Sequence, residues 1–155
     1  MTFIQPCFIR KNSPELRKKL EKLDYEPCHQ MTIHPDIYKN IAICNFFGCK
    51  YYGVSDAEVS RPGSIEDAIK NRGMVDCGTN EELFFALAAL RDDTDKYQWF
   101  YSTGWTDFEG NPIPDKWVFC DQDTLEHFAF VNNSTNTYRS GWKKANVEEI
   151  IEHFK

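Results

Sequence analysis

The sequence has no long apolar run and no excess of basic residues. No window approaches the ~18 consecutive apolar residues of a membrane-spanning helix, and residues 1–12 lack the basic start and apolar run of a signal peptide. We therefore expect a cytoplasmic protein without a membrane partner. The formal net charge of -6 disfavours nonspecific binding to a phosphate backbone, so we expect no nucleic-acid partner either.

Common catalytic signatures are also missing. The chain contains no Gly-x-Ser-x-Gly, no Gly-rich phosphate loop with Lys-Ser/Thr, no His-Glu-x-x-His and no Gly-x-Gly-x-x-Gly. Cys77 precedes a capped helix, whose N-terminus would favour a thiolate. A cysteine at the end of a strand that leads into a buried helix is more often part of the core, so we predict no catalytic residue.

Six cysteines are present, at positions 7, 28, 44, 49, 77 and 120. In a reducing compartment they are expected to be free thiols packed as small hydrophobic residues. Their irregular spacing does not give the paired ligands typical of structural zinc sites, and the acidic clusters lack the spacing of a calcium loop. We predict no metal site and no cofactor.

The composition is that of an ordinary globular protein. A length of 155 residues favours a single domain, residues 1–155, with one core. The aromatic content of 15% is high, and these side chains either fill a core or line a binding surface. Composition does not distinguish the two.

The stretch DCGTNEELFFALAALRDD, residues 76–93, predicts the central helix. Thr79 can cap the first turn while Glu82 reaches back to the Thr79 amide, which is a capping box. Every residue from Leu83 to Leu90 is apolar, so no face can be left to water. We predict a helix over residues 80–91 that is buried on all sides.

Three further helix starts repeat this pattern. Asn12 and Glu15 open a first helix, and Asn146 and Glu149 open a C-terminal helix over residues 146–154. Ser64 begins a further helix whose start matches this capping pattern less closely. The basic cluster around the first helix is interrupted by glutamates, and we interpret it as a solvated face.

Strand candidates surround the first and central helices in a similar order. They lie at residues 3–10, 31–34, 41–44 and 49–54 in one half, and at 74–77, 97–102, 116–120 and 127–131 in the other. We expect Cys44 and Cys49 to face each other across a turn. The order suggests two diverged β-α-β-β-(β) units, with pseudo-repeat halves 1–54 and 73–131.

These patterns predict the α+β class. Short turns join antiparallel strands, so we expect one mainly antiparallel sheet of five to seven strands with helices on one face. A runner-up is a half-barrel of two such units, as in the vicinal oxygen chelate family.

Three blocks, FIRKNSPELRKKLEKLDY, DCGTNEELFFALAALRDDTDKYQWF and WKKANVEEIIEHFK, are distributed between residues 8 and 155. With them, the chain resembles small uncharacterised proteins of bacteriophages and prophages of gut anaerobic bacteria. The resemblance implies a phage or mobile-element context inside a host cell. It carries over no activity and no site residue.

Four aromatic residues are our predicted binding residues: Trp99, Tyr101, Trp105 and Phe108. Strand alternation places Trp99 and Tyr101 on one face and Phe100 on the other. If Phe100 lies on the core side, the other face is open to a partner; if the indole of Trp99 is core, no aromatic strip is left. Trp105 and Phe108 lie in the Gly/Pro-rich loop 103–115, which either packs under itself or contacts a partner.

These features predict a non-catalytic binding protein that acts on a host protein or a small metabolite, with modulation of host defence as one version. The alternative is a metal-dependent enzyme of the vicinal oxygen chelate type. That enzyme would need at least two of Gln5, His34, Glu126 and His127 to converge on an ion. The sequence gives no indication of an oligomeric state.

Overall fold

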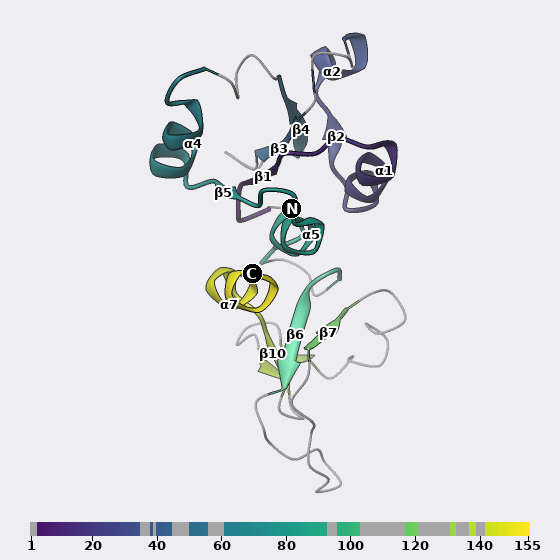
Figure 1. Cartoon of the computed structure of the whole chain (residues 1–155). Helices are drawn as coiled ribbons and strands as arrows, with labels where there is room; N and C mark the ends of the chain where they lie inside the picture. Colours follow the sequence, from purple (N-terminus) through teal and green to yellow (C-terminus); the bar gives the residue numbers. More distant parts are fainter. Residues whose placement is uncertain are drawn as a thin grey trace, which may run out of the picture.

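The structure is a computed structural model of the chain, and it describes residues 3–34, 38, 40–44, 50–55, 61–92, 96–102, 117–120, 131–132, 137–138 and 142–155. Two five-stranded sheets lie on either side of a helical layer formed by α5 (Glu81–Ala88) and α7 (Val147–Phe154) (Figure 1). The α+β class is therefore confirmed. The expected single sheet is replaced by two sheets that share one layer of helices.

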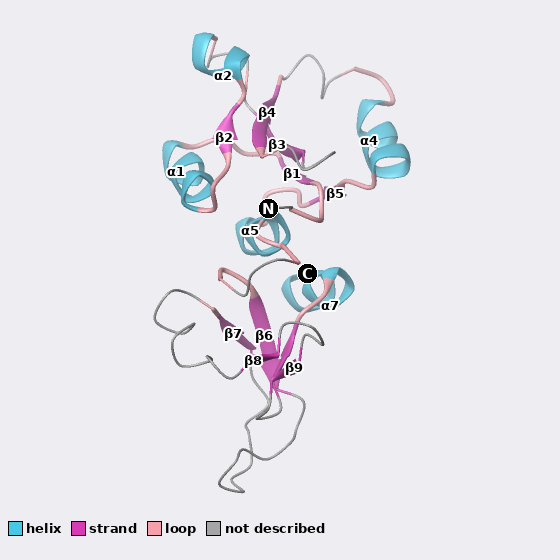
Figure 2. Ribbon diagram, turned by 180° about the vertical axis from the view of Figure 1, so that it is seen from behind, coloured by secondary structure: helices cyan, strands magenta, loops and turns pink. Residues whose placement is uncertain are grey.

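The first sheet is mixed and the second is antiparallel throughout. In spatial order the first sheet contains β2 (Glu26–Pro27), β4 (Tyr51–Val54), β3 (Asn40–Cys44), β1 (Cys7–Ile9) and β5 (Val75–Asp76). In spatial order the second contains β7 (Trp117–Phe119), β6 (Trp99–Ser102), β10 (Trp142–Lys144), β9 (Thr137–Tyr138) and β8 (Val131–Asn132). Figure 2 shows the two sheets from behind.

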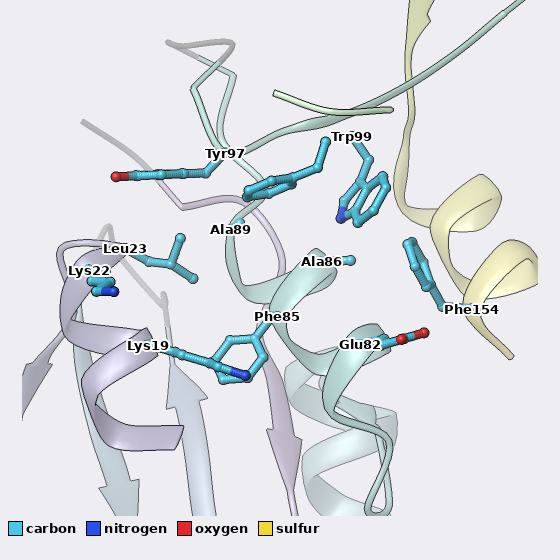
Figure 3. Close-up of a pocket in the computed structure, with 11 residues that line it drawn as sticks. Lys19, Lys22, Leu23, Glu82, Phe85, Ala86, Ala89, Tyr97, Trp99 and Phe154 are labelled. Carbon is cyan, nitrogen blue, oxygen red and sulfur yellow. The ribbon is translucent and has the colours of Figure 1, made fainter. Parts of the chain in front are cut away.

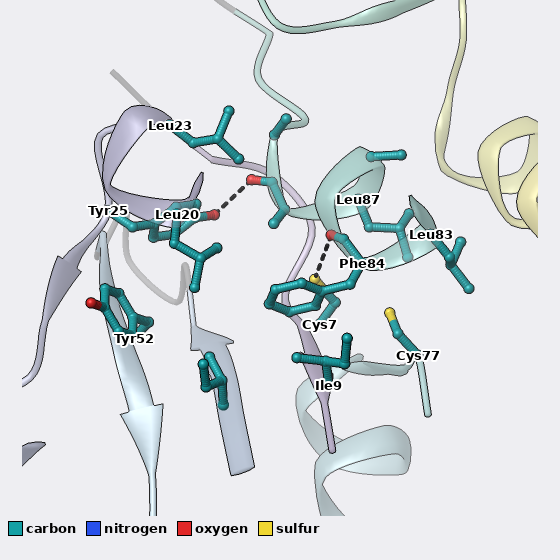
Figure 4. Close-up of a cluster of buried hydrophobic side chains, with 14 of the residues drawn as sticks. Cys7, Ile9, Leu20, Leu23, Tyr25, Tyr52, Cys77, Leu83, Phe84 and Leu87 are labelled. Carbon is teal, nitrogen blue, oxygen red and sulfur yellow. Dashed lines mark hydrogen bonds between the residues drawn. The ribbon is translucent and has the colours of Figure 1, made fainter. Parts of the chain in front are cut away.

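Strand β1 is buried on both faces, which explains its unbroken apolar sequence. Cys7 and Ile9 belong to the main core, where they lie beside α5 (Figure 4). Phe8 points the other way and packs with Ile65 and Ala68 of α4 (Ser64–Arg72). The expectation of helices on one face is therefore wrong for this sheet, because α4 covers the face opposite to α5.

Strand pairing does not follow the expected halves. β5, which was expected to open the second unit, pairs in parallel with β1 in the first sheet. β10 lies beyond residue 131, yet it occupies the centre of the second sheet. Both pairings join segments that are far apart in sequence, and local patterns do not encode them.

Two local predictions are also wrong. Residues 31–34 do not form a strand, because His29–Ile33 is the short helix α2, whose Met31 is buried in the core. Cys44 does not face Cys49, since the β3–β4 register pairs Cys44 with Tyr51. Cys49 itself lies outside the described residues.

The central helix α5 is mostly buried, but the prediction that it spans residues 80–91 and is buried on all sides is wrong in detail: it ends at Ala88, Phe85 is only partly buried, and its cap differs. Asn80, and not Thr79, is the N-cap, and its Oδ1 accepts a hydrogen bond from the Leu83 amide at 3.1 Å. The Asn80 side-chain amide also donates to the Phe154 carbonyl at 2.7 Å, which ties the start of α5 to the end of α7.

The other helix starts agree with the pattern to within one residue. Ser13 caps α1 (Pro14–Lys22) in place of Asn12, and Pro14 occupies the first turn, where a missing amide has no consequence. The capping box between Asn146 and Glu149 forms as predicted at the start of α7.

Three side chains from outside α5 donate to carbonyls at or just beyond its C-terminal end. The Tyr25 hydroxyl donates to the Ala88 carbonyl at 2.7 Å (Figure 4). Gln98 donates to the Ala89 carbonyl, and the Lys144 ammonium donates to the Arg91 carbonyl at 2.8 Å. The end of α5 is thereby joined to the residues that follow α1, to the residue before β6 and to β10 of the second sheet.

Tyr52 in β4 predicts a loss of stability at alkaline pH. Burial and the nearby Glu21 carboxylate, whose Oε1 accepts a hydrogen bond from the Tyr52 hydroxyl at 3.3 Å, raise the pKa of Tyr52 from 10.0 to about 12. The folded protein therefore keeps this proton at a pH where the unfolded chain has lost it. The contribution of Tyr52 to stability is complete below pH 10 and falls as the pH rises toward about 12.

Denaturant unfolding at neutral pH and across this alkaline range tests the Tyr52 prediction. Tyr52→Phe should lower the free energy of unfolding by about 1 kcal/mol at neutral pH, through the lost hydrogen bond, and should flatten the alkaline decline. Tyr51→Phe is the matched control, because Tyr51 is 49% exposed. An alkaline decline of equal steepness in Tyr52→Phe and the wild type would refute the assignment.

Candidate functional site

A pocket of about 460 Å³ lies where the two halves of the molecule meet at α5 (Figure 3). Four segments line it: the end of α1, one side of α5, strands β6 and β7 with the turn before β6, and the end of α7. Its lining is mainly apolar. The pocket is therefore assembled from parts of the chain that are widely separated in sequence.

Small side chains on α5 leave the space open. Ala86 and Ala89 are three residues apart, so they lie on the same side of the helical turn and form the floor. Phe85 stands at the edge of this floor, and Leu23 from the residue after α1 closes one side. Larger residues in place of the alanines would fill the pocket.

Aromatic rings form the wall that faces α5. The ring of Phe119 lies 5.3 Å from that of Trp99 and 6.1 Å from that of Tyr97, measured between centroids. Phe154 from α7 meets Trp99 edge-on at 4.9 Å. Phe119 is still 37% exposed, so the wall is reachable from solvent. Such a wall suits a flat, apolar ligand.

Tyr97 has an unusual backbone conformation. Its φ of 66° lies in the left-handed region, which costs energy for a bulky residue and persists only where the surroundings enforce it. Its amide donates to the Cys120 carbonyl at 2.6 Å, and the Lys96 ammonium lies 4.9 Å from the centre of its ring. This local strain places the Tyr97 ring on the pocket wall.

Three charged side chains border the pocket: Lys19, Lys22 and Glu82. The lysines are three residues apart on α1 and lie on one side of the pocket, while Glu82 lies on the side nearer Phe154 (Figure 3). The Lys19 ammonium is 5.4 Å from the centre of the Phe85 ring. The polar border is thus positive on one side and negative on the other.

Of the predicted binding residues, Trp99 lines the pocket. Tyr101 lies on the same face of β6 but outside the pocket, where its ring stacks on Trp117 at 5.2 Å. Burial and a hydrogen bond with Glu149 raise the pKa of Tyr101. Trp105 and Phe108 lie outside the described residues, so their role stays a prediction.

The face of β6 that carries Trp99 is not an open strip. Phe100 is on the opposite face and 0% exposed, which agrees with the predicted alternation. The first face is nevertheless covered by α7, since Phe154 contacts Trp99 and the His153 ring stacks on Trp117 at 3.9 Å. The side chains of this face are therefore only partly exposed, and Trp99 contributes its accessible part to the pocket wall.

The sequence signals for the remaining pocket residues were weak. Tyr97 and Phe119 lie in predicted strands and Phe154 lies in the predicted C-terminal helix, but no sequence pattern marks them as pocket residues. Lys19 and Lys22 belong to the basic cluster that we interpreted as a solvated face, and both are exposed. Nothing in a single sequence separates lysines that border a pocket from those that do not.

The described thiols are core groups. Cys7 and Cys77 are free and buried, Cys120 is buried, and Cys28 is free and partly buried. Burial, a hydrogen bond with Cys77 and the nearby Cys77 charge raise the pKa of the Cys7 thiol. Its weakly acidic S–H lies 3.8 Å from the Phe84 carbonyl. These surroundings do not activate Cys7 as a nucleophile.

Within the described ranges, no group of three or more His, Cys, Asp or Glu side chains is placed to hold a metal ion. Gln5 donates to the Pro6 and Gly73 carbonyls at 2.8 and 2.9 Å, and His34 is the exposed residue that ends α2. Glu126 and His127 lie outside the described residues. The metal-dependent alternative therefore stays a prediction.

Comparisons with known proteins give no match: no family model, no curated protein and no solved structure is similar to the chain. Among the helices that the structure describes, none has the length and apolar character needed to cross a membrane.

Proposed function

We propose that this chain is a non-catalytic binding protein whose ligand is a small apolar molecule held in the pocket of α1, α5, β6, β7 and α7. The observation that carries the proposal is the aromatic wall of Trp99, Phe119 and Phe154 facing a floor of two alanines. A volume of about 460 Å³ lies within the usual range of ligand pockets, about 300–1,000 Å³.

The chemistry of the lining supports binding over catalysis. The described residues around the pocket include no cysteine, serine or histidine, and the charged groups stand at its border. A cysteine or serine nucleophile paired with a histidine base is therefore missing from this part of the lining. The sequence predicts either a host protein or a small metabolite as the partner, and the pocket favours the small molecule. The phage context and a role in host defence rest on the resemblance alone and stay predictions.

A pocket-filling variant tests the proposed function. The neutral fluorescent probe N-phenyl-1-naphthylamine should bind the wild type with increased emission. Ala86→Leu places three carbons in the floor and should weaken probe binding by about tenfold or more, because the ligand and the new side chain compete for one space.

Ala68→Leu is the matched control for Ala86→Leu. It adds the same three carbons on α4, where Ala68 packs near Phe8 and away from the pocket. Probe binding should survive in this variant. Equal binding to the wild type and Ala86→Leu, with both folded by circular dichroism, would refute binding in the pocket.

A further inference from the structure

We propose that the pocket selects amphipathic anions: a flat apolar body lies against the aromatic wall, and a single carboxylate pairs with Lys19 and Lys22. This inference rests on the proposed function and names the class of ligand. It follows from the positions of the charged groups around the pocket, which the apolar lining alone does not explain.

The first support is the placement of the two lysines. Residues three apart on a helix share a face, so α1 presents both ammonium groups to the same side of the pocket. Figure 3 shows the Lys19 side chain reaching across to Phe85. The 5.4 Å contact between its ammonium and that ring holds the charge at the pocket border.

The second support is that both charges are available. Two other lysines of the first half of the chain are in ion pairs: Lys11 pairs with Glu81 at 3.3 Å, and Lys50 pairs with Glu26 at 3.4 Å. In the part of the chain that the structure describes, Lys19 and Lys22 form no ion pair. Two uncompensated positive charges at one pocket, in a chain of net charge -6, favour an anionic ligand.

The third support is the polarity of the pocket along its length. Glu82 lies on the side nearer α7 and repels an anion there, while the Tyr97 hydroxyl points toward the side on which Lys22 lies (Figure 3). A carboxylate at the α1 side would meet two ammonium groups and a phenol donor. The apolar body would then extend toward Trp99 and Phe154.

The arrangement of the aromatic rings in the pocket wall indicates which ring system the apolar part of the ligand has. The rings of Trp99 and Phe119 are tilted by 50° and lie 5.3 Å apart, and together with Tyr97 they line one continuous side. A fused two-ring system can stack with its flat face on one of these rings and meet the tilted neighbour with its edge. The proposed class is therefore an aromatic carboxylate of about two fused rings.

A matched ligand pair tests the proposal. We expect 2-naphthoate to bind the wild type about tenfold more tightly than 2-naphthalenemethanol, as measured by isothermal titration, because the acid gains charge-assisted hydrogen bonds. This preference should shrink as salt is added, because exposed charges are screened. The two ligands share the same ring system, so the difference reports on the anion alone.

The lysine variants locate the anion. Lys19→Met with Lys22→Met keeps the aliphatic stems, and it should abolish the preference for the acid while leaving affinity for the alcohol unchanged. Lys18→Met is the control, since Lys18 is an exposed residue of α1 outside the pocket. That variant should retain the tenfold preference.

The contradicting outcomes are distinct. Equal affinity for the acid and the alcohol in the wild type overturns anion selection but leaves apolar binding intact. A preference that survives in the double methionine variant overturns the role of the two lysines. Failure of both ligands and of N-phenyl-1-naphthylamine to bind overturns the proposed function itself.

Discussion

Phe84→Ala should lower the free energy of unfolding by about 3–5 kcal/mol. Phe84 is 0% exposed and lies in the main core with Ile9 and Leu20, on the side of α5 that faces the first sheet (Figure 4). Because α5 is shared by both halves of the molecule, its surroundings have little freedom to collapse into the space left by the ring. Urea unfolding followed by circular dichroism measures the change.

Phe85→Ala is the internal comparison for Phe84→Ala. Phe85 is the next residue of α5, but it is only partly buried and borders the pocket. We expect its removal to cost less than half as much stability and to alter ligand binding. Similar losses of stability in the two variants would contradict the buried position assigned to Phe84.

Gln98→Leu should destabilise the protein by about 2–4 kcal/mol, because it leaves buried backbone groups without partners. Gln98 is 1% exposed. Its side-chain amide donates to the Ala89 carbonyl and to the Lys96 carbonyl at 3.2 Å, and its Oε1 accepts from the Arg91 amide at 3.1 Å. Leucine has a similar volume but satisfies none of these groups.

Gln98→Glu separates hydrogen bonding from packing. A carboxyl group keeps the shape and the acceptor for Arg91, but an ionised one cannot donate to the Ala89 carbonyl. Burial would raise the pKa of this introduced acid, so the stability of the variant should recover as the pH falls and the acid becomes protonated. A pH-independent deficit, measured by urea unfolding at several pH values, would contradict the hydrogen-bonding explanation.

Local patterns predicted the four longer helices well because each contains its own start signal, whereas the short helix α2 has no side-chain cap and was missed. Eight consecutive apolar residues leave no polar face, so α5 had to be buried wherever it lay. Its cap was misplaced by one residue because Thr79 and Asn80 are both good cap residues. In the structure Asn80 is the cap, and its side chain also donates a hydrogen bond to the Phe154 carbonyl. The sequence pattern does not show this tertiary contact.

The sheets were harder to predict because their pairing is not local. The apolar stretch of β1 was predicted to form a strand, but its sequence does not indicate that β5 is its parallel neighbour. The same limit applies to the pocket. Trp99 was predicted from its strand, whereas Lys19 and Phe154 become neighbours of the same cavity only through the packing of α1 and α7 around α5.

The position of β10 has a consequence for how the protein is made. This strand joins β6 to β9 at the centre of the second sheet, yet it is the last strand of the chain and is followed directly by α7. As the chain leaves the ribosome, the first sheet can close once β5 has emerged, but the second must wait for residues 142–144. Since Phe154 completes the pocket, a nascent chain can fold half of its architecture before it can hold any ligand there.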